Sequence, residues 1–194
     1  SDLAFASMLG GMAITNAKLG AAHGLASALG GKISAPHSVI TARLAPFVML
    51  ENIAVAREQQ RADILARYQR IAQIVTGKAQ ASAEDAISWL SEVLDTLKLP
   101  SILEFGVCEA QFEEVSVDAL KSVAIKGNPL PLNQQRLIHI LQQVCEKCHC
   151  GEAQSEVTFS HDDDESQMAE SSFTIINSYA TENSVVEKGN SWTI

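Results

Sequence analysis

Residues 16–46 read NAKLGAAHGLASALGGKISAPHSVITARLAP and contain two of the chain's five histidines, His23 and His37. The apolar spacing around His23 predicts a short helix over residues 20–29 with a glycine stop. Pro36 then predicts the start of a second helix, with His37 in its first turn. Two imidazoles mounted on rigid helices can bind one metal ion, because neutral histidine is the commonest metal ligand in proteins. A histidine on an apolar helix face can also be a core residue, so spacing alone leaves both interpretations open.

The same stretch resembles the metal-binding signature of the iron-containing alcohol dehydrogenases, which reads G-x-x-H-G-x-A-H-x-x-G and, after a short gap, P-H-G. Two positions depart from it. Ser27 stands where many members carry another histidine, and Ser38 stands where a glycine is usual. The residues that match the signature are Gly20, His23, Gly24, Ala26, Gly30, Pro36 and His37.

The resemblance continues in order along the chain and covers about residues 1–146. It includes RYQRIAQIVTG at 67–77, AEDAISWLSEVLDTLKLP at 83–100 and SVAIKGNPLPLN at 122–133. Glycerol dehydrogenase and dehydroquinate synthase share the architecture that the resemblance implies. The Pro36-His37 pair and the GNPLPL segment favour the alcohol dehydrogenase branch.

This resemblance implies a protein of two domains with a metal ion between them. In the family, an N-terminal α/β domain binds NAD or NADP, and the C-terminal domain is built from helices. The metal ligands are an aspartate, a histidine four residues later, and two histidines that correspond to His23 and His37. The first two ligands would precede Ser1. We therefore expect residues 1–146 to be an all-α helical bundle that supplies two of four ligands to Fe(II), with Zn(II) also possible.

The resemblance also implies the chemistry of the whole enzyme. The metal acts as a Lewis acid that holds the alcohol oxygen and favours the alkoxide, and a hydride passes from the alcohol carbon to the nicotinamide ring. We expect small alcohols or aldehydes as substrates, a cytoplasmic homo-oligomer, and no dehydrogenase activity for this chain without the N-terminal dinucleotide-binding domain. No catalytic side chain is assigned within the chain. The alternative is a truncated, non-catalytic helical relative that serves as an interaction module.

Composition independently favours helices for the body of the chain. Hydrophobic residues make up 46% and aromatic residues only 5%, so the core must be aliphatic and rich in alanine. No segment before residue 150 shows sustained alternation of apolar and polar residues. Pro46 should kink or break the second helix. Beyond the signature, helices are predicted over residues 3–17, 37–56, 58–75 ending at Gly77, 85–97, 109–115, 117–126 and, capped by Asn133, 134–146.

Charge separates the body from an acidic tail. Residues 151–194 contain nine acidic residues and one lysine, which accounts for −8 of the net charge of −9. Neither part has a run of basic residues that could form a positive surface, so we do not expect the chain to bind nucleic acid. The apolar run at 3–14 is shorter than the roughly 20 residues that cross a bilayer, so no membrane span or signal peptide is predicted. We expect residues 147–194 to be largely disordered, with strand propensity only at 173–179.

Several further groups leave alternatives open. Cys145, Cys148 and His149 fit the C-x-x-C-H pattern of haem attachment, and with Cys150 they could grip zinc, although incidental thiols at a helix end explain them more simply. The acidic run that follows His161 could collect a cation or be a solvated surface. His139 lies among apolar residues of the last helix and is expected to be structural or exposed rather than catalytic.

Overall fold

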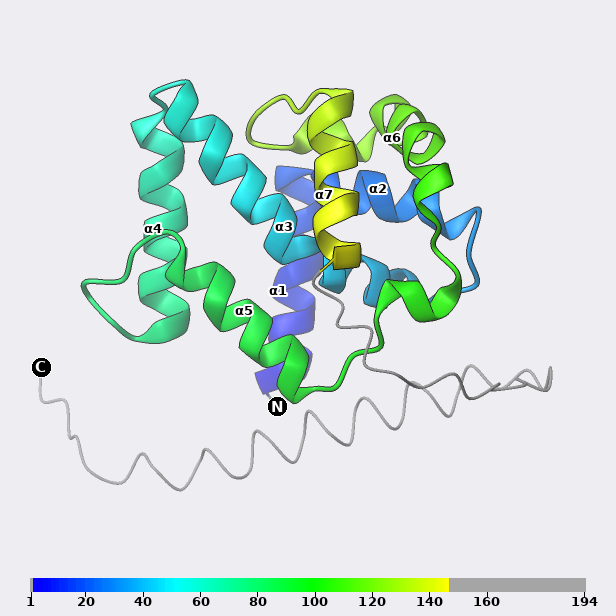
Figure 1. The fold of residues 1–194 in the computed structure, drawn as a ribbon. Helices are drawn as coiled ribbons and strands as arrows, with labels where there is room; N and C mark the ends of the chain where they lie inside the picture. The colour runs from blue at the N-terminus through cyan, green and yellow to red at the C-terminus, as the bar shows by residue number, and fades with distance from the viewer. Residues whose placement is uncertain (1, 147–194) are drawn as a thin grey trace, which may run out of the picture. The chain divides into compact units, whose positions relative to one another are not determined.

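The computed structural model describes residues 2–146, which form seven α-helices and three short 3-10 helices (Figure 1). The predicted tail, its possible strand, and the residues at 148–150 and 161–164 lie outside the described residues. The all-α prediction is confirmed for the described part of the chain. The elements are α1 (Asp2–Ala17), α2 (Ala21–Gly30), α3 (His37–Glu58), α4 (Ala62–Thr76), α5 (Asp85–Thr96), η1 (Ile102–Phe105), η2 (Glu109–Gln111), α6 (Phe112–Lys121), η3 (Ala124–Gly127) and α7 (Gln134–Glu146).

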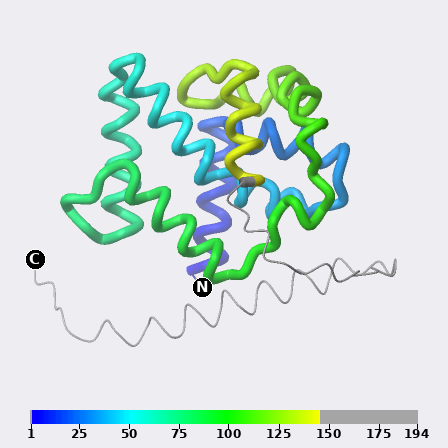
Figure 2. Tube along the Cα trace, in the orientation of Figure 1, coloured from blue at the N-terminus to red at the C-terminus, as the bar shows by residue number. Residues whose placement is uncertain are grey.

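Helix α3 is the centre of the fold, since it packs against α2, α4, α5 and α7. By length and apolar composition alone it could span a membrane, but half of its apolar stretch is buried by these neighbours, as in a core helix. Figure 2 shows the chain returning past α3 several times, with α4 and α5 on one side and α2 and α6 on the other.

The main core is aliphatic, as composition predicts. Each fully buried leucine or isoleucine side chain contributes about 1.5–3 kcal/mol relative to exposure. A smaller cluster between α4, α5 and the loop that joins them is made of Ala72, Ala81 and Ala86. The largest side chains with no exposed surface in the main core are Leu25 and Leu29 of α2, Ile40 and Leu44 of α3, Ile102 of η1, Val115 of α6, and Leu137, Ile140 and Leu141 of α7.

Three helix predictions need correction. Pro46 does not break α3, which runs through it, because the proline is buried among packed helices that hold the backbone in place. The next helix begins at Ala62 rather than at residue 58, after a turn in which Gln60 adopts a φ of 54°. The two helices predicted over 109–126 are instead the single helix α6 between two 3-10 turns. Ser116 lies inside α6, where its hydroxyl donates to the Glu113 carbonyl over 2.7 Å.

A polar cluster joins the middle of α3 to α7. Glu51 is 4% exposed, and its carboxylate accepts from Arg136 Nη1 at 2.5 Å. The other Glu51 oxygen lies 3.1 Å from His139 Nδ1. Arg136 also donates to both carboxylate oxygens of Glu58, at 2.8 and 2.6 Å. His139 was expected to be structural or exposed, and it is exposed while its ring lies against Glu51.

Removing the Arg136 side chain should destabilise the fold strongly. In Arg136→Ala the Glu51 carboxylate stays buried, loses its guanidinium and keeps only the His139 contact, and breaking a buried ion pair by removing one partner costs about 3–5 kcal/mol. Urea unfolding followed by circular dichroism measures the loss. The control is Arg70→Ala, because Arg70 is exposed on α4 and makes only a 3.5 Å contact with Gln73. Equal stability of the two variants would show that the cluster does not stabilise the fold.

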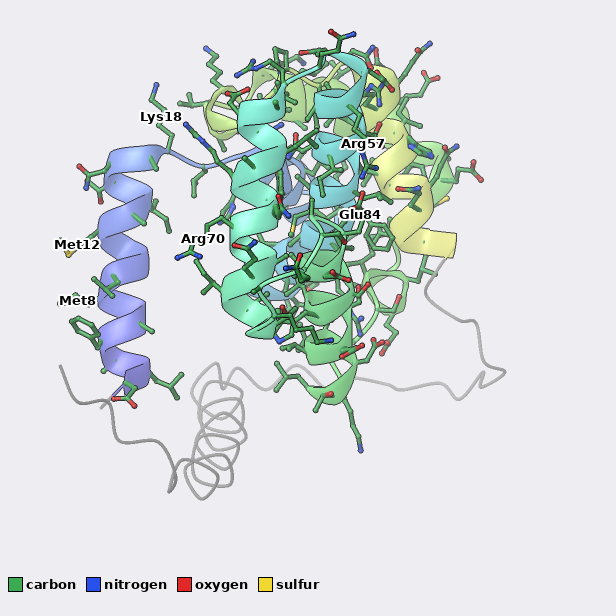
Figure 3. The ribbon with its side chains drawn as sticks, turned by 90° about the vertical axis from the view of Figure 1, so that its left-hand side faces the viewer. Met8, Met12, Lys18, Arg57, Arg70 and Glu84 are labelled. Atoms are coloured by element: carbon green, nitrogen blue, oxygen red, sulfur yellow. The ribbon has the colours of Figure 1, made fainter. Side chains whose placement is uncertain are left out.

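Helix α1 differs from the others because none of its residues is buried. Its side chains are apolar on all sides, and a helix of this kind is normally enclosed by other protein. Figure 3 shows α1 standing beside the other helices, with Met8 and Met12 on its far side. Four large apolar side chains of α1 are half exposed or more: Phe5, Met8, Met12 and Ile14, at 59%, 53%, 56% and 50%.

Candidate metal centre

The structure brings His23 and His37 together. His23 lies in the first turn of α2, and His37 is the first residue of α3, directly after Pro36 at the N-cap position. Their ring centroids are 5.5 Å apart, and the ring planes are inclined by 52°. The turn and loop at 31–36 reverse the chain between the two helices, so that residues fourteen positions apart face each other.

This separation fits one metal ion held by both rings. A nitrogen–metal bond of about 2.1 Å places the ion roughly 3.2 Å from the centroid of each imidazole ring. Centroids 5.5 Å apart then subtend about 120° at the ion, close to the tetrahedral angle. Two structural histidines in a core would instead be enclosed, whereas His37 is exposed and His23 is only partly buried. The described residues contain no cluster of three or more histidine, cysteine or acidic side chains able to hold a metal ion.

The electrostatics of the pair favour the form that binds metal. Partial burial lowers the pKa of His23 from its ordinary value of 6.5, and the neighbouring His37 lowers it further. A histidine must be neutral to coordinate a metal ion. His23 thus stays ready to bind at a lower pH than a free histidine does.

The lowered pKa of His23 predicts acid sensitivity of the fold. Above about pH 6.5 His23 is neutral in both the folded and the unfolded chain, so it has no effect on stability. As the pH falls below 6.5 the unfolded chain takes up the proton first, and the folded state loses stability until the pH passes the lower, folded pKa. The fall in Tm between pH 7.5 and 5.5 should therefore be smaller in His23→Gln than in the unaltered chain. An unchanged fall would contradict this account.

The signature glycines have a packing role beside the histidines. A Cβ atom on Gly24 would lie 3.2 Å from the Ile125 Cβ, and one on Gly20 would lie 3.1 Å from the Asn128 Oδ1. Both positions are close approaches between α2 and the segment around η3. The glycines thus let that segment pack tightly against the helix that carries His23.

Ser27, one of the two departures from the signature, is exposed and bonded within its own helix. Its hydroxyl donates to the His23 carbonyl over 2.8 Å, and Thr41 makes the same bond, at 2.9 Å, to the His37 carbonyl. Both hydroxyls thus donate to backbone carbonyls of their own helices. Asn128 of the GNPLPL segment contacts the start of α2, and its local sequence gives no signal of this contact.

The described residues form an all-helical domain that carries the candidate two-histidine site, and comparison with known proteins identifies the family of this domain. The model of the Fe-containing alcohol dehydrogenase family, C-terminal, matches residues 1–145. The chain is 35% identical over 144 residues to 1,3-propanediol dehydrogenase of Klebsiella pneumoniae, a match that covers 73% of this chain and 36% of that protein. It is 29% identical over 147 residues to alcohol dehydrogenase 4 of Saccharomyces cerevisiae, covering 75% and 37%.

A solved structure shows the same arrangement of helices. The crystal structure of a 1,3-propanediol oxidoreductase superposes with a TM-score of 0.62 and 31% sequence identity, over 73% of this chain and 36% of that one. The chain belongs to the iron-containing alcohol dehydrogenase family and corresponds to its C-terminal helical domain. It spans just over a third of the length of these relatives.

Proposed function

We propose that this chain is the metal-binding part of an iron-dependent, NAD(P)-linked alcohol dehydrogenase, in which His23 and His37 each supply a ligand to the catalytic metal. The observation that carries the proposal is the 5.5 Å separation of the two rings on adjoining helix starts. The bound metal supplies Lewis-acid chemistry at the substrate oxygen, and the nicotinamide supplies the hydride acceptor. The role of this chain's residues is to hold the ion in one place with neutral donors.

The remaining parts of the site are assigned to protein outside this chain. Two imidazoles bind Fe(II) or Zn(II) weakly without an anionic ligand that compensates the charge. By resemblance to the family, an aspartate and a histidine from the preceding segment complete the ligand set, and an N-terminal domain binds the dinucleotide. The exposed apolar surface of α1 supports this assignment, because that helix needs further protein around it.

The test is an assay of the full-length protein beside the 194-residue chain. We expect reduction of NAD or NADP by the full-length protein loaded with Fe(II), with 1,3-propanediol or 1-propanol as substrate, and none by the chain alone. Activity should be lost on chelation and in His23→Ala or His37→Ala. His139→Ala is the matched control and should remain active, since His139 contacts Glu51 and not the pair. Turnover that survives chelation and both substitutions would overturn the proposal.

A second candidate function is a non-catalytic interaction module. The observation that favours it is the same exposed α1, which would then bind a partner other than a dehydrogenase domain. A full-length protein that binds metal through neither histidine and has no turnover with any alcohol tested would select this candidate.

A further inference from the structure

One side-chain amide links the two helices that carry the histidines. Asn128 follows η3, and its Oδ1 accepts from the backbone N–H of Ala21, the first residue of α2, over 3.1 Å. Its Nδ2 donates to Asn52 Oδ1 in α3 and to the carbonyl of Leu130, each over 2.7 Å. Asn128 therefore contacts α2, α3 and its own loop at the same time.

The bond to Ala21 acts as a helix cap supplied from a distant part of the chain. The first N–H groups of an α-helix have no partner within the helix, and a side chain at the N-cap usually accepts from one of them. The N-cap of α2 is Gly20, which has no side chain. Asn128 provides the acceptor instead, from 107 residues away. His23 lies two residues after Ala21 in the same helical turn, so the direction of its side chain follows the placement of this turn.

The other side of the link is anchored in the core. Asn52 is only 1% exposed, and its Nδ2 returns to Asn128 Oδ1 at 3.4 Å. It belongs to α3, the helix that begins with His37 and packs along α2. Asn52 thus fixes the first turn of α2, through Asn128, relative to α3, which is the helix that carries His37.

The backbone next to Asn128 allows little movement. Gly127 is pressed against the connection between α1 and α2, where an added Cβ would overlap the Leu19 carbonyl oxygen and lie 2.8 Å from the Lys18 Cβ. The Asn128 backbone N–H also donates to the Ile125 carbonyl over 3.0 Å. The backbone on the N-terminal side of the Asn128 Cα atom is thus held in place, and the side-chain amide can serve as a fixed reference point.

We propose that Asn128 is a positioning residue, which sets the separation of the His23 and His37 rings by capping α2 and joining it to Asn52 of α3. The proposal rests on the proposed function insofar as the two rings share a metal ion. It adds that the affinity for that ion depends on an amide that does not touch it. A cap that served stability alone would leave the relative position of the two rings unchanged when removed from a chain that stays folded.

The experiment compares Asn128→Ala with Asn133→Ala in the 194-residue chain. Asn133 is a matched control because its Oδ1 also accepts from a backbone N–H at a helix start, that of Arg136 over 3.0 Å, but in α7, which carries neither histidine of the pair. The readouts are Zn(II) affinity by calorimetry, the NMR cross-peak between the His23 and His37 ring protons, and Tm. We expect Asn128→Ala to weaken Zn(II) binding at least tenfold and to lose most of the cross-peak. Asn133→Ala should lower the Tm by the loss of a single cap bond, keep the cross-peak and bind Zn(II) within twofold of the unaltered chain.

The cross-peak tests the positioning role of Asn128 separately from the metal site, because the cross-peak requires no metal. If the unaltered chain bound no Zn(II) but the cross-peak still fell in Asn128→Ala alone, the claim that this chain holds the ion by itself would fail and the positioning role would stand. An equal cross-peak in both variants would overturn the positioning role. If Asn128→Ala does not fold, Asn128→Asp replaces it, because a carboxylate keeps the acceptor for Ala21 and removes the donor to Asn52. It should weaken the cross-peak partially, and an unchanged cross-peak in that variant would overturn the proposal.

Discussion

Gly127→Ala is expected to destabilise the chain by about 3 kcal/mol or more, among the largest effects of any single methyl group added to this fold. The methyl group would overlap the Leu19 carbonyl oxygen and approach the Lys18 Cβ and the Leu19 carbonyl carbon, at 2.8 and 3.0 Å. Two of these three atoms belong to the backbone and cannot rotate away. The η3 segment and the α1–α2 connection would have to separate, and the bond from Ala21 to Asn128 would break with them.

The measurement for Gly127 is urea unfolding followed by circular dichroism. Gly30→Ala is the control, because no atom lies within 4 Å of its added Cβ and the residue ends a helix. That variant should be as stable as the unaltered chain or more stable by up to about 1 kcal/mol, since alanine favours the helix over glycine. If Gly127→Ala were as stable as Gly30→Ala, the close approach at Leu19 would not exist in solution.

His23→Ala and His37→Ala are each expected to weaken metal binding by at least tenfold, which corresponds to about 1.4 kcal/mol. Two ligands of one ion act as a unit, so the double variant should bind hardly more weakly than either single variant. Titration of the chain with Zn(II) and with Fe(II) under anaerobic conditions measures this. His139→Ala should bind as the unaltered chain does, because its ring pairs with Glu51. If the losses of binding free energy in the two single variants summed to the loss in the double variant, the two histidines would belong to separate sites.

Much of the fold could be predicted from local sequence signals. Gly77 ends α4 in the left-handed conformation, with a φ of 69°, as its place after an amphipathic run predicts. Asn133 caps α7 through its bond to the Arg136 N–H. Such signals work because the cap and the helix that it ends are neighbours in the chain. Pro46 was expected to kink or break α3, and the helix is not broken at this residue, because burial by distant helices outweighs the local cost of a proline.

In the candidate site too, contacts between residues close in the chain could be predicted, and contacts between distant residues could not. The pairing of His23 with His37 could be anticipated, because both lie in one short stretch that resembles a known signature. The link from Asn128 to Ala21 could not, because it joins residues 107 positions apart and nothing in the local pattern of either residue points to the other. Likewise, His139 could be judged structural from its helix, but its partner Glu51 lies 88 residues away.

The most direct test of the shared metal site is an anomalous-difference map of the full-length protein crystallised with Zn(II) and measured at the zinc absorption edge. We predict one strong peak within about 2.1 Å of a ring nitrogen of both His23 and His37. A peak bonded to only one of them, or a zinc ion bound at other residues with both rings empty, would contradict the account.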